Sequence, residues 1–243
     1  MLSSGVGKGL TRIGSPLRKD GQVDYVWDFS AVWRNMDQLL AGLKGTAILT
    51  VACLTLALPL GLALAVMRMS PQRLIRWPAV AVVDFFRAAP ALVLIVWFYF
   101  AFPLIANVNL DAFGAAFLAI GLQSSAYMAE VFRAGMQAIG RGQWEAASAI
   151  GLTKAAAVRH VILPQAVRHM IPVFLIRFAE LVKGTTLAGI IAYGETVYQA
   201  NMLAAQTYRP LEVFTLTALV FFVLIFSITG AAQFLNARLG RGK

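Results

Sequence analysis

The sequence predicts an all-α polytopic membrane protein with about five transmembrane helices, an amphipathic N-terminal segment and a helical cytoplasmic loop. Three observations support this prediction. The 243-residue chain is 59% hydrophobic and 13% charged, and its mean hydropathy of +0.72 exceeds what a soluble domain of this size needs. Apolar runs long enough to cross a bilayer recur along the chain, and a polar, alanine-rich stretch interrupts them. Little length is left for an enzymatic domain outside the membrane, so we do not expect an enzyme.

The strongly basic composition has two explanations. The net charge is +10 and the isoelectric point is near 10.3, which is compatible with binding to nucleic acid. No basic patch interleaved with stacking aromatic residues occurs, however, so we expect no nucleic-acid partner. In a membrane protein, an excess of Lys and Arg typically marks the cytoplasmic side, which faces anionic lipid. Cys53 is the single cysteine and has no partner for an internal disulfide.

The first 44 residues are predicted to precede the transmembrane domain. Residues 1–22 are rich in Gly, Ser, Lys and Arg and contain no apolar core of a signal peptide, which predicts a flexible tail. Residues 23–43 are amphipathic, and Trp27 and Trp33 suit the headgroup layer. We therefore expect an interfacial helix that lies on the membrane before the first span.

Five spans are predicted between residues 45 and 237. Four of them follow uncharged runs, whereas charged residues interrupt the fourth in chain order. An odd number of spans places the two termini on opposite sides of the membrane. The expected boundaries are about 45–67, 88–110, 112–132, 164–184 and 213–237 for the spans, 138–163 for the loop between spans three and four, and 238–243 for a cytoplasmic tail.

The loop at 138–163 is predicted to contain two short helices. Alanine favours the helix, and Gly151 supplies a residue that adopts the left-handed conformation ending the first helix. Thr153 can cap the second helix, and Pro164 suits the first turn of the helix that follows. An ordinary alanine-rich surface hairpin would have the same local pattern.

Longer motifs distinguish these alternatives. The stretch EAASAIGLTKAAAVRHVILP at 145–164 resembles the cytoplasmic coupling loop of the membrane subunits of ABC importers, with Val161 where that family has Ile. Residues 121–152 and 85–100, the latter FFRAAPALVLIVWFYF, resemble the polar-amino-acid branch of these type I permeases. The run KGTTL at 183–187 is similar to a Lys-(Asp/Asn)-(Thr/Ser)-Ser-Leu motif of that branch, with Gly184 and Thr186 as departures. The resemblance covers roughly residues 27–236.

This resemblance implies a transmembrane subunit that translocates polar amino acids across the bacterial cytoplasmic membrane. The net charge of +1 carried by Arg177, Glu180 and Lys183 in span four favours glutamate or aspartate as the candidate. The implied partners are two ABC ATPase subunits, a second permease that is either the same chain or a homologue, an extracytoplasmic substrate-binding protein and the lipid bilayer. No Walker A pattern occurs, so this chain is expected to bind no cofactor, and ATP and Mg belong to the partner ATPase. The residues implied to dock the ATPase are Glu145, Ala146, Ala147, Gly151, Leu152, Thr153 and Lys154.

The positive-inside rule supports a cytoplasmic position for this loop. With the loop inside, more Lys and Arg residues lie on the cytoplasmic than on the outer side, although the basic N-terminal tail argues weakly for the reverse. We therefore expect a multi-pass protein with its N-terminus outside and its C-terminus in the cytoplasm.

Charged residues in span four are the first candidates for a substrate pathway. Arg177, Glu180 and Lys183 recur every third residue, so they share one side of a helix. A charge at membrane depth is costly and should face a partner or a water-filled path. One interpretation is an ion-pair ladder that only fixes helix packing. The other is that this side lines the substrate path, together with Thr185 and Thr186.

A second set of polar candidates lies on spans two and three. Gln123 and Tyr127 form a stripe with Glu130 at spacings of four and three, and this stripe either binds ligand or makes hydrogen bonds between helices. Glu130 can also pair with Arg133. Arg87 precedes span two, and a local ion pair with Asp84 competes with a role in gating or substrate binding.

The alternative from another functional class is a secondary amino acid transporter driven by an ion gradient. Such proteins are usually built from internal repeats, and none is visible in this sequence. The sequence leaves open which amino acid is carried and whether the permease pairs with itself or with a homologue.

Overall fold

The computed structural model describes residues 25–240, with side chains as far as Arg238. Every regular element in this part of the chain is helical, which confirms the all-α prediction. The predicted tail at 1–22 and residues 241–243 lie outside the described residues. The α-helices are α1 (Ser30–Arg34), α2 (Met36–Arg68), α3 (Arg73–Ala88), α4 (Ala91–Val96), α5 (Phe102–Ala106), α6 (Ala112–Gln137), α7 (Arg141–Ala149), α8 (Lys154–Ala157), α9 (Leu163–Gly184), α10 (Thr196–Thr207) and α11 (Pro210–Gly240); η1 (Trp97–Ala101) and η2 (Val158–Ile162) are π-helical and η3 (Thr185–Ile191) is a 3-10 helix.

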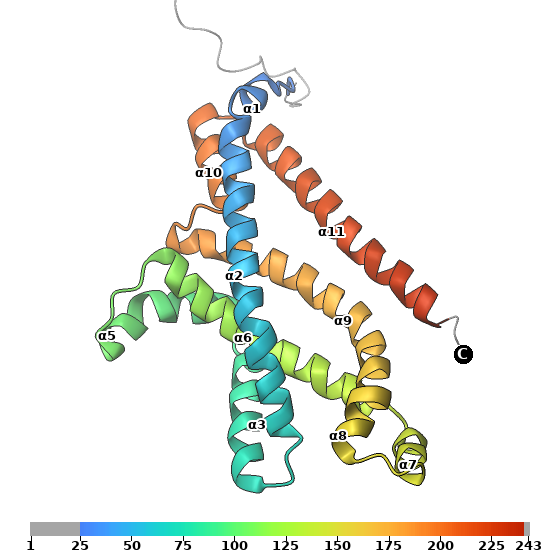
Figure 1. The fold of residues 1–243 in the computed structure, drawn as a ribbon. Coiled ribbons are helices and arrows are strands. Elements are labelled where there is room, and N and C mark those ends of the chain that lie inside the picture. The colour runs from blue at the N-terminus through green and yellow to red at the C-terminus, as the bar shows by residue number, and fades with distance from the viewer. Residues whose placement is uncertain (1–24, 241–243) are drawn as a thin grey trace, which may run out of the picture.

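The long helices α2 and α6 cross near the centre of the molecule and pack extensively on each other (Figure 1). Helix α3 lies beside one half of α2, and α10 lies beside the other half. Helix α9 packs on α6, and α11 packs on α9 and α10. Helices α1 and α10 lie at one end of the molecule, and α7 and α8 lie at the opposite end (Figure 1).

The crossing of α2 and α6 requires a glycine. A Cβ atom at Gly61 would lie 2.7 Å from the Cβ of Met128 and 2.9 Å from the carbonyl oxygen of Ser125. A larger residue would therefore force the two backbones apart. Small buried residues on the α6 side of the contact, including Ala126 and Ala129, allow the same close approach. This contact fixes the position of α6, which carries many of the candidate site residues.

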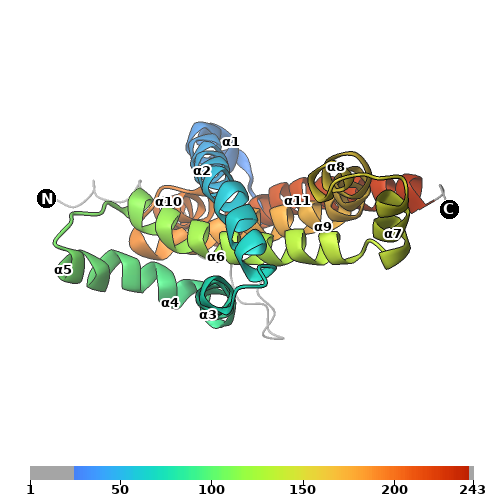
Figure 2. The same ribbon diagram turned by 60° about the horizontal axis from the view of Figure 1, so that its bottom comes forward.

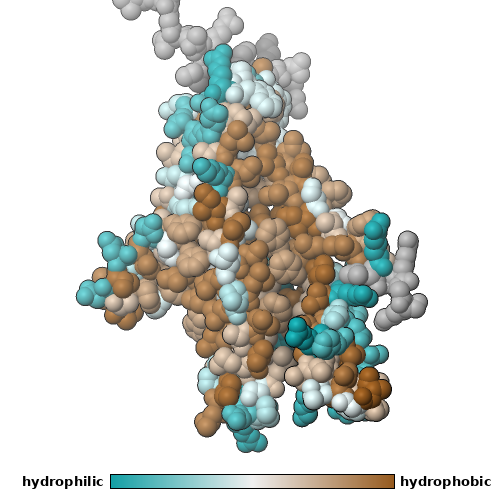
Figure 3. Space-filling model, viewed as in Figure 1, coloured by the Kyte–Doolittle hydropathy of each residue, from teal (hydrophilic) through white to brown (hydrophobic). Residues whose placement is uncertain are grey.

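Apolar side chains cover the middle of the molecule, and polar side chains gather at its ends (Figure 3). Helix α11 is the most exposed of the apolar helices, because only 17% of its most apolar window is buried inside the protein. Phe222, Val223 and Phe226 on this helix are more than half exposed. Such a surface is stable only when lipid or another apolar partner covers it.

Three single helices are long and apolar enough to cross a bilayer: α2, α6 and Pro210–Arg238 of α11. The expected spans at 45–67, 112–132 and 213–237 lie within these helices. The expected span at 164–184 lies within α9, whose charged residues keep it out of this apolar group. The described part of the chain thus has three apolar spans, and a fourth if one bent helix pair is included.

The bent pair replaces the straight second span expected at 88–110. Arg73–Ala88 and Ala91–Ala106 are together long and apolar enough for one span but are inclined by 103° to each other. Helix α3 already begins at Arg73, in a region where charged residues suggested a loop. The break arises at Pro90, because the residue before a proline avoids the helical conformation, and Ala89 is extended with φ −70° and ψ 134°. Figure 2 shows α4 and α5 leaving the end of α3 sideways along α6.

The N-terminal segment does not form the long interfacial helix expected at 23–43. In its described part, only the short helix Ser30–Arg34 is separate, and residues from Met36 onward are the first turns of α2. No proline interrupts the chain there, so the helix continues into the first span. Trp27 and Trp33 are nevertheless more than half exposed, as residues of a headgroup layer would be.

Both π-helical turns are followed closely by a proline. Turn η1 ends at Ala101, two residues before Pro103, and η2 ends at Ile162, two residues before Pro164. A proline in a continuing helix lacks an N–H and its ring crowds the preceding turn, and a widened turn relieves both problems. Pro164 lies in the first turn of α9, as predicted.

Candidate functional site

The loop between α6 and α9 has the local structure that its sequence predicts. Helix α7 ends after Ala149, and Gly151 adopts a left-handed conformation with φ +78°. The N–H of Leu152 donates to the carbonyl of Ala147 at 3.1 Å, which closes the turn. The hydroxyl of Thr153 accepts from the N–H of Ala156 at 3.3 Å and caps α8. The first helix is therefore short and ends at the glycine turn, as predicted. The second is not short, because the helical conformation continues from Lys154 through η2 into α9, where the widened turn of η2 accommodates Pro164.

This loop presents a small, mostly exposed surface at one end of the molecule. Glu145, Ala146, Gly151, Thr153 and Lys154 are exposed, whereas Leu152 is half-buried and Ala147 is buried. Within the described residues Glu145 forms no ion pair, so its carboxylate is free to contact a partner.

Ile150 is an exposed residue that the sequence reasoning missed, with 75% of its surface accessible at the tip of the loop. An isolated bulky apolar residue next to the turn glycine was the available signal.

The loop rests on the body of the protein through a small apolar cluster. Val131 and Ile139 pack with Ile162, Ala166 and Met170, and Trp144 of α7 packs against this group. The side chain of Gln165 donates to that of Gln143 at 3.1 Å and ties α9 to α7. A force applied to α7 would therefore reach both α6 and α9.

The charged residues of α9 do not form one continuous set. Arg177 donates to Glu180 at 2.6 Å, and its guanidinium lies 4.9 Å from the ring centroid of Tyr127 on α6. Lys183 makes no ion pair with any described residue. Two of the charges thus face α6, and the third lies elsewhere on the helix.

A small cavity lies between α6 and α9. Its volume is about 70 Å³, and its polar lining consists of Gln123, Ser124, Tyr127, Arg177 and Glu180. The structure therefore brings together candidates from spans three and four that are separated by some 50 residues in sequence. A volume of this size admits a few water molecules but is well below the roughly 300 Å³ of a typical ligand site.

A larger, open groove lies on the other side of α9. It has a volume of about 530 Å³, is lined mainly by Phe221, Phe222, Ile225 and Phe226 of α11, and includes Lys183 and Thr186. Thr186 also donates to the carbonyl of Lys183 at 2.7 Å. Thr185 is fully buried and donates to the carbonyl of Val182, so it faces neither the cavity nor the groove.

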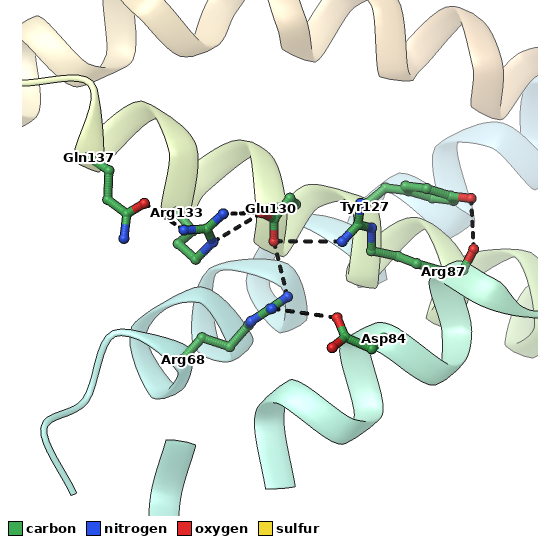
Figure 4. A network of polar contacts seen from close by, with 7 residues as sticks. All are labelled: Arg68, Asp84, Arg87, Tyr127, Glu130, Arg133 and Gln137. Carbon is green, nitrogen blue, oxygen red and sulfur yellow. Dashed lines mark hydrogen bonds and ion pairs between the residues drawn. The ribbon is translucent and has the colours of Figure 1, made fainter. Parts of the chain in front are cut away.

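The polar stripe of α6 makes hydrogen bonds to the backbone at the bend between α3 and α4. The amide of Gln123 donates to the carbonyls of Phe86 at 3.2 Å and Ala89 at 2.8 Å. The hydroxyl of Tyr127 donates to the carbonyl of Arg87 at 3.4 Å (Figure 4). Of the two interpretations of this stripe, hydrogen bonding between helices is thus observed, although both side chains also line the cavity.

Glu130, the last residue of the stripe, lies at the centre of an ion network (Figure 4). It accepts from Arg133 one turn away, as predicted, and lies 3.0 Å from Arg68 of α2 and 3.9 Å from Arg87 of α3. Asp84 pairs with Arg68 at 3.5 Å, so the expected local pair between Asp84 and Arg87 is not formed. Sequence spacing suggested the local pair because it could not show that α2 and α6 approach α3 here.

Two buried carboxylates join elements at the opposite end of the molecule. Glu195 accepts from the N–H groups of Val197 and Tyr198 and caps α10; its complete burial raises the pKa of its carboxyl to about 7. Its side chain is inaccessible, so it offers no direct contact to a docking protein. Glu212 is also fully buried and accepts from Tyr25 and from the N–H of Asp28.

Comparisons with known proteins agree with this arrangement. The family described as "binding-protein-dependent transport system inner membrane component" matches residues 57–241. A probable glutamine ABC transporter permease protein of Bacillus subtilis, GlnM, is 34% identical over 86% of this chain and 97% of its own. The glutamate/aspartate import permease protein GltK of Escherichia coli O6:H1 is 31% identical over 88% of this chain and 99% of its own. The fold is similar to that in a crystal structure of an amino acid ABC transporter with histidines, with a TM-score of 0.81 and 31% sequence identity. The alignment covers 88% of this chain and 100% of that chain.

Proposed function

Because the chain belongs to the family of binding-protein-dependent transport system inner membrane components, we propose that it forms the amino acid pathway of an ABC importer and that partner ATPases drive it. The observation that carries this proposal is the loop at 138–163. Its turn exposes Gly151 and small neighbouring residues at one end of the molecule, and its base packs on α6 and α9. A surface of this shape enters a cleft on a partner and transmits a push to the spans. The family and the fold favour this function over a secondary transporter driven by an ion gradient.

The proposed assembly contains two ATPase subunits, a second permease and an extracytoplasmic substrate-binding protein. ATP and Mg bind to the ATPases, and this chain supplies the docking surface formed by Glu145, Ala146, Gly151, Thr153 and Lys154. The exposed apolar face of α11 supports the presence of a second permease, since an apolar partner covers such a face as well as lipid does.

The proposed orientation places the loop and the C-terminus in the cytoplasm of a bacterium and the N-terminus outside. Helices α7 and α8 then lie on the cytoplasmic side of the inner membrane, and α1 and α10 lie on the outer side. The ion network around Glu130, the exposed Arg73 and the half-buried Arg76 fall on the cytoplasmic side, in agreement with the positive-inside rule.

The proposed substrate is a polar amino acid. Lys183 lies at the wall of the groove with no carboxylate partner among the described residues, so it can attract the carboxylate that every amino acid carries. Arg177 and Glu180 line the cavity as a neutral pair, which offers both a donor and an acceptor. Glutamate and aspartate are our first candidates, since a second carboxylate gains most from an unpaired cation; relatives named for glutamine and for glutamate/aspartate make glutamine the next.

Reconstituted uptake and crosslinking test this function together. Purified permease in liposomes, with its ATPases and binding protein, should accumulate radiolabelled glutamate, aspartate or glutamine only when ATP is present. Thr153→Cys, at an exposed position of the loop, should crosslink to the ATPase, whereas Leu104→Cys on α5 should not. Ala147 is unsuitable as a crosslinking site because it is buried. Uptake driven by an ion gradient without ATP would refute the proposal.

A further inference from the structure

The break between α3 and α4 leaves backbone carbonyls without helical donors. The carbonyl of Phe86 would accept from the N–H of residue 90 in a continuous helix, but residue 90 is proline and has none. The carbonyls of Arg87, Ala88 and Ala89 also lose their helical partners, because the chain turns by 103° before α4 begins. Groups of this kind inside a membrane protein require another donor.

Side chains of α6 supply donors for three of these four carbonyls. Gln123 donates to Phe86 and to Ala89, and Tyr127 donates to Arg87. Glu130, one turn further along the same face, contacts the guanidinium of Arg87 (Figure 4). One face of α6 therefore stabilises the bend through contacts with residues 34 to 43 positions away in sequence.

The same two donors also form part of the cavity wall. Gln123 and Tyr127 line the cavity opposite Arg177 and Glu180, and the guanidinium of Arg177 lies over the ring of Tyr127. The cavity of about 70 Å³ is partly open and too small to enclose an amino acid, so a ligand that occupies it must displace some of these side chains. The carboxylate of a ligand, which accepts hydrogen bonds, then competes with the backbone carbonyls for the amide N–H of Gln123 and the hydroxyl of Tyr127 that hold the bend.

The bend separates two parts of the molecule with different neighbours. Helix α3 packs on α2 and α6 beside the ion network of Arg68, Asp84 and Glu130, and α4 packs on α6 and η3 near the other end of α6. A change of angle at residues 88–91 would therefore move α3 and its ionic contacts relative to α4.

We propose that Gln123 and Tyr127 are positioning residues that link occupation of the cavity to the angle between α3 and α4. With the cavity empty, their hydrogen bonds hold the bend. With an amino acid bound, the bonds exchange to the ligand, and the released carbonyls favour a different angle, which shifts the ion network at the cytoplasmic end. We call the hydrogen bonds from Gln123 and Tyr127 to the bend the latch. This inference rests on the proposed function for the identity of the ligand, whereas the latch itself depends only on contacts within the chain.

Spin-label distances across the bend test the latch directly. Labels at Val82 on α3 and Leu104 on α5 occupy exposed positions, and a Cys53→Ala background removes the native thiol. Labelled permease is diluted into unlabelled permease within the complete importer, so that each complex carries at most one labelled copy. Distances are measured without ligand and with glutamate, aspartate or glutamine added together with the binding protein.

Two variants remove the donors separately. Gln123→Leu removes the amide, and Tyr127→Phe removes only the hydroxyl and keeps the ring under Arg177. Each should shift or broaden the ligand-free distance distribution and reduce the ligand-induced change by at least half. Each lost bond corresponds to a factor of about five to ten in the equilibrium between angles. Ser124→Ala, which alters the cavity wall but no observed bond to the break, should keep the ligand-free distribution.

The outcomes separate this inference from the proposed function. If both variants took up amino acid as the wild type does and gave the wild-type distance distributions with and without ligand, the latch would be overturned. The proposed transport function would then still stand. If both variants changed the ligand-free distances but the wild-type permease transported no amino acid with ATP, the latch would be supported and the proposed function would be refuted. Tyr127→Phe preserves the packing of the ring, so a failure of Gln123→Leu to fold leaves the test decisive.

Discussion

Substitution of Gly151 is expected to uncouple ATP hydrolysis from uptake. Its φ of +78° is a conformation that residues with a Cβ rarely adopt, at a cost of about 1–2 kcal/mol. Among the described residues, no neighbouring atom lies within 4 Å of a Cβ built at this position, so Gly151→Glu meets no clash with them. The strain alone reduces the population of the native turn by a factor of about 5–30, and the added side chain obstructs entry into a partner cleft.

Three substitutions separate strain from bulk. Gly151→Asn introduces a side chain that tolerates the left-handed conformation and should retain more uptake than Gly151→Glu. Gly142→Glu is the matched control, because a Cβ there also meets nothing within 4 Å and lies in helix α7. Each variant is reconstituted with its ATPases and binding protein, and ATP hydrolysis and amino acid uptake are measured in the same liposomes.

The expected result is normal membrane insertion for all three variants and at least a fivefold loss of uptake per ATP hydrolysed for Gly151→Glu alone. If Gly151→Glu and Gly142→Glu transported equally well, the loop would not be the docking surface, and our account of energy transfer would be incorrect.

Three further predictions concern charged residues. Lys183→Gln and Glu180→Gln should each lower uptake about tenfold or more while assembly stays normal. The first removes the cation proposed to attract the substrate carboxylate, and the second removes the charged partner of Arg177 at the cavity wall. Since burial raises the pKa of Glu195 to about 7 from 4.5, the folded protein binds a proton more tightly than the unfolded chain, and stability should fall as pH rises from about 5 to about 7. Glu195→Gln should flatten this pH dependence in thermal unfolding of the purified importer. Glu130→Gln leaves three arginines without their shared carboxylate and should cost about 2–3 kcal/mol, whereas Asp84→Asn, at a side chain that is 55% exposed, should cost less than about 1 kcal/mol in denaturant unfolding.

Each of these predictions has a contradicting result. Unchanged uptake in both α9 variants would restrict these charges to helix packing. A thermal midpoint that rises between pH 5 and pH 7, or a slope that persists in Glu195→Gln, would show that another group controls stability. Equal destabilisation by Glu130→Gln and Asp84→Asn would mean that the ion network is not centred on Glu130.

The features that were correctly predicted depend on local rules. Alanine content, a glycine after α7 and a threonine before α8 define the short helix α7, the turn and the start of the next helix, because capping and the left-handed conformation involve residues within four positions of each other. The membrane class followed from apolar composition alone, since a bilayer imposes both span length and apolarity. The pair between Glu130 and Arg133 was also predictable, because residues three apart on a helix are neighbours.

The second span shows where such rules fail. Charged residues at 73–87 suggested a loop, but in the structure they belong to α3, because Arg68 of α2 and Glu130 of α6 provide partners that only the packing reveals. The identity of Pro90 indicates a break but not its angle. That angle also depends on donors from α6, such as Gln123, whose positions are set by the crossing of α2 and α6.

Composition and short-range spacing therefore predicted the membrane class, most of the long helices and the glycine turn of the loop at 138–163, because covalent geometry and the bilayer act on each segment separately. Only the tertiary structure assigned partners to the polar side chains: it placed Arg177 and Glu180 against α6 and Lys183 against α11, and it directed Gln123 and Tyr127 to the broken helix. A hydrogen bond or an ion pair forms between groups a few ångströms apart, and distances between segments remote in sequence are fixed by packing of the whole chain.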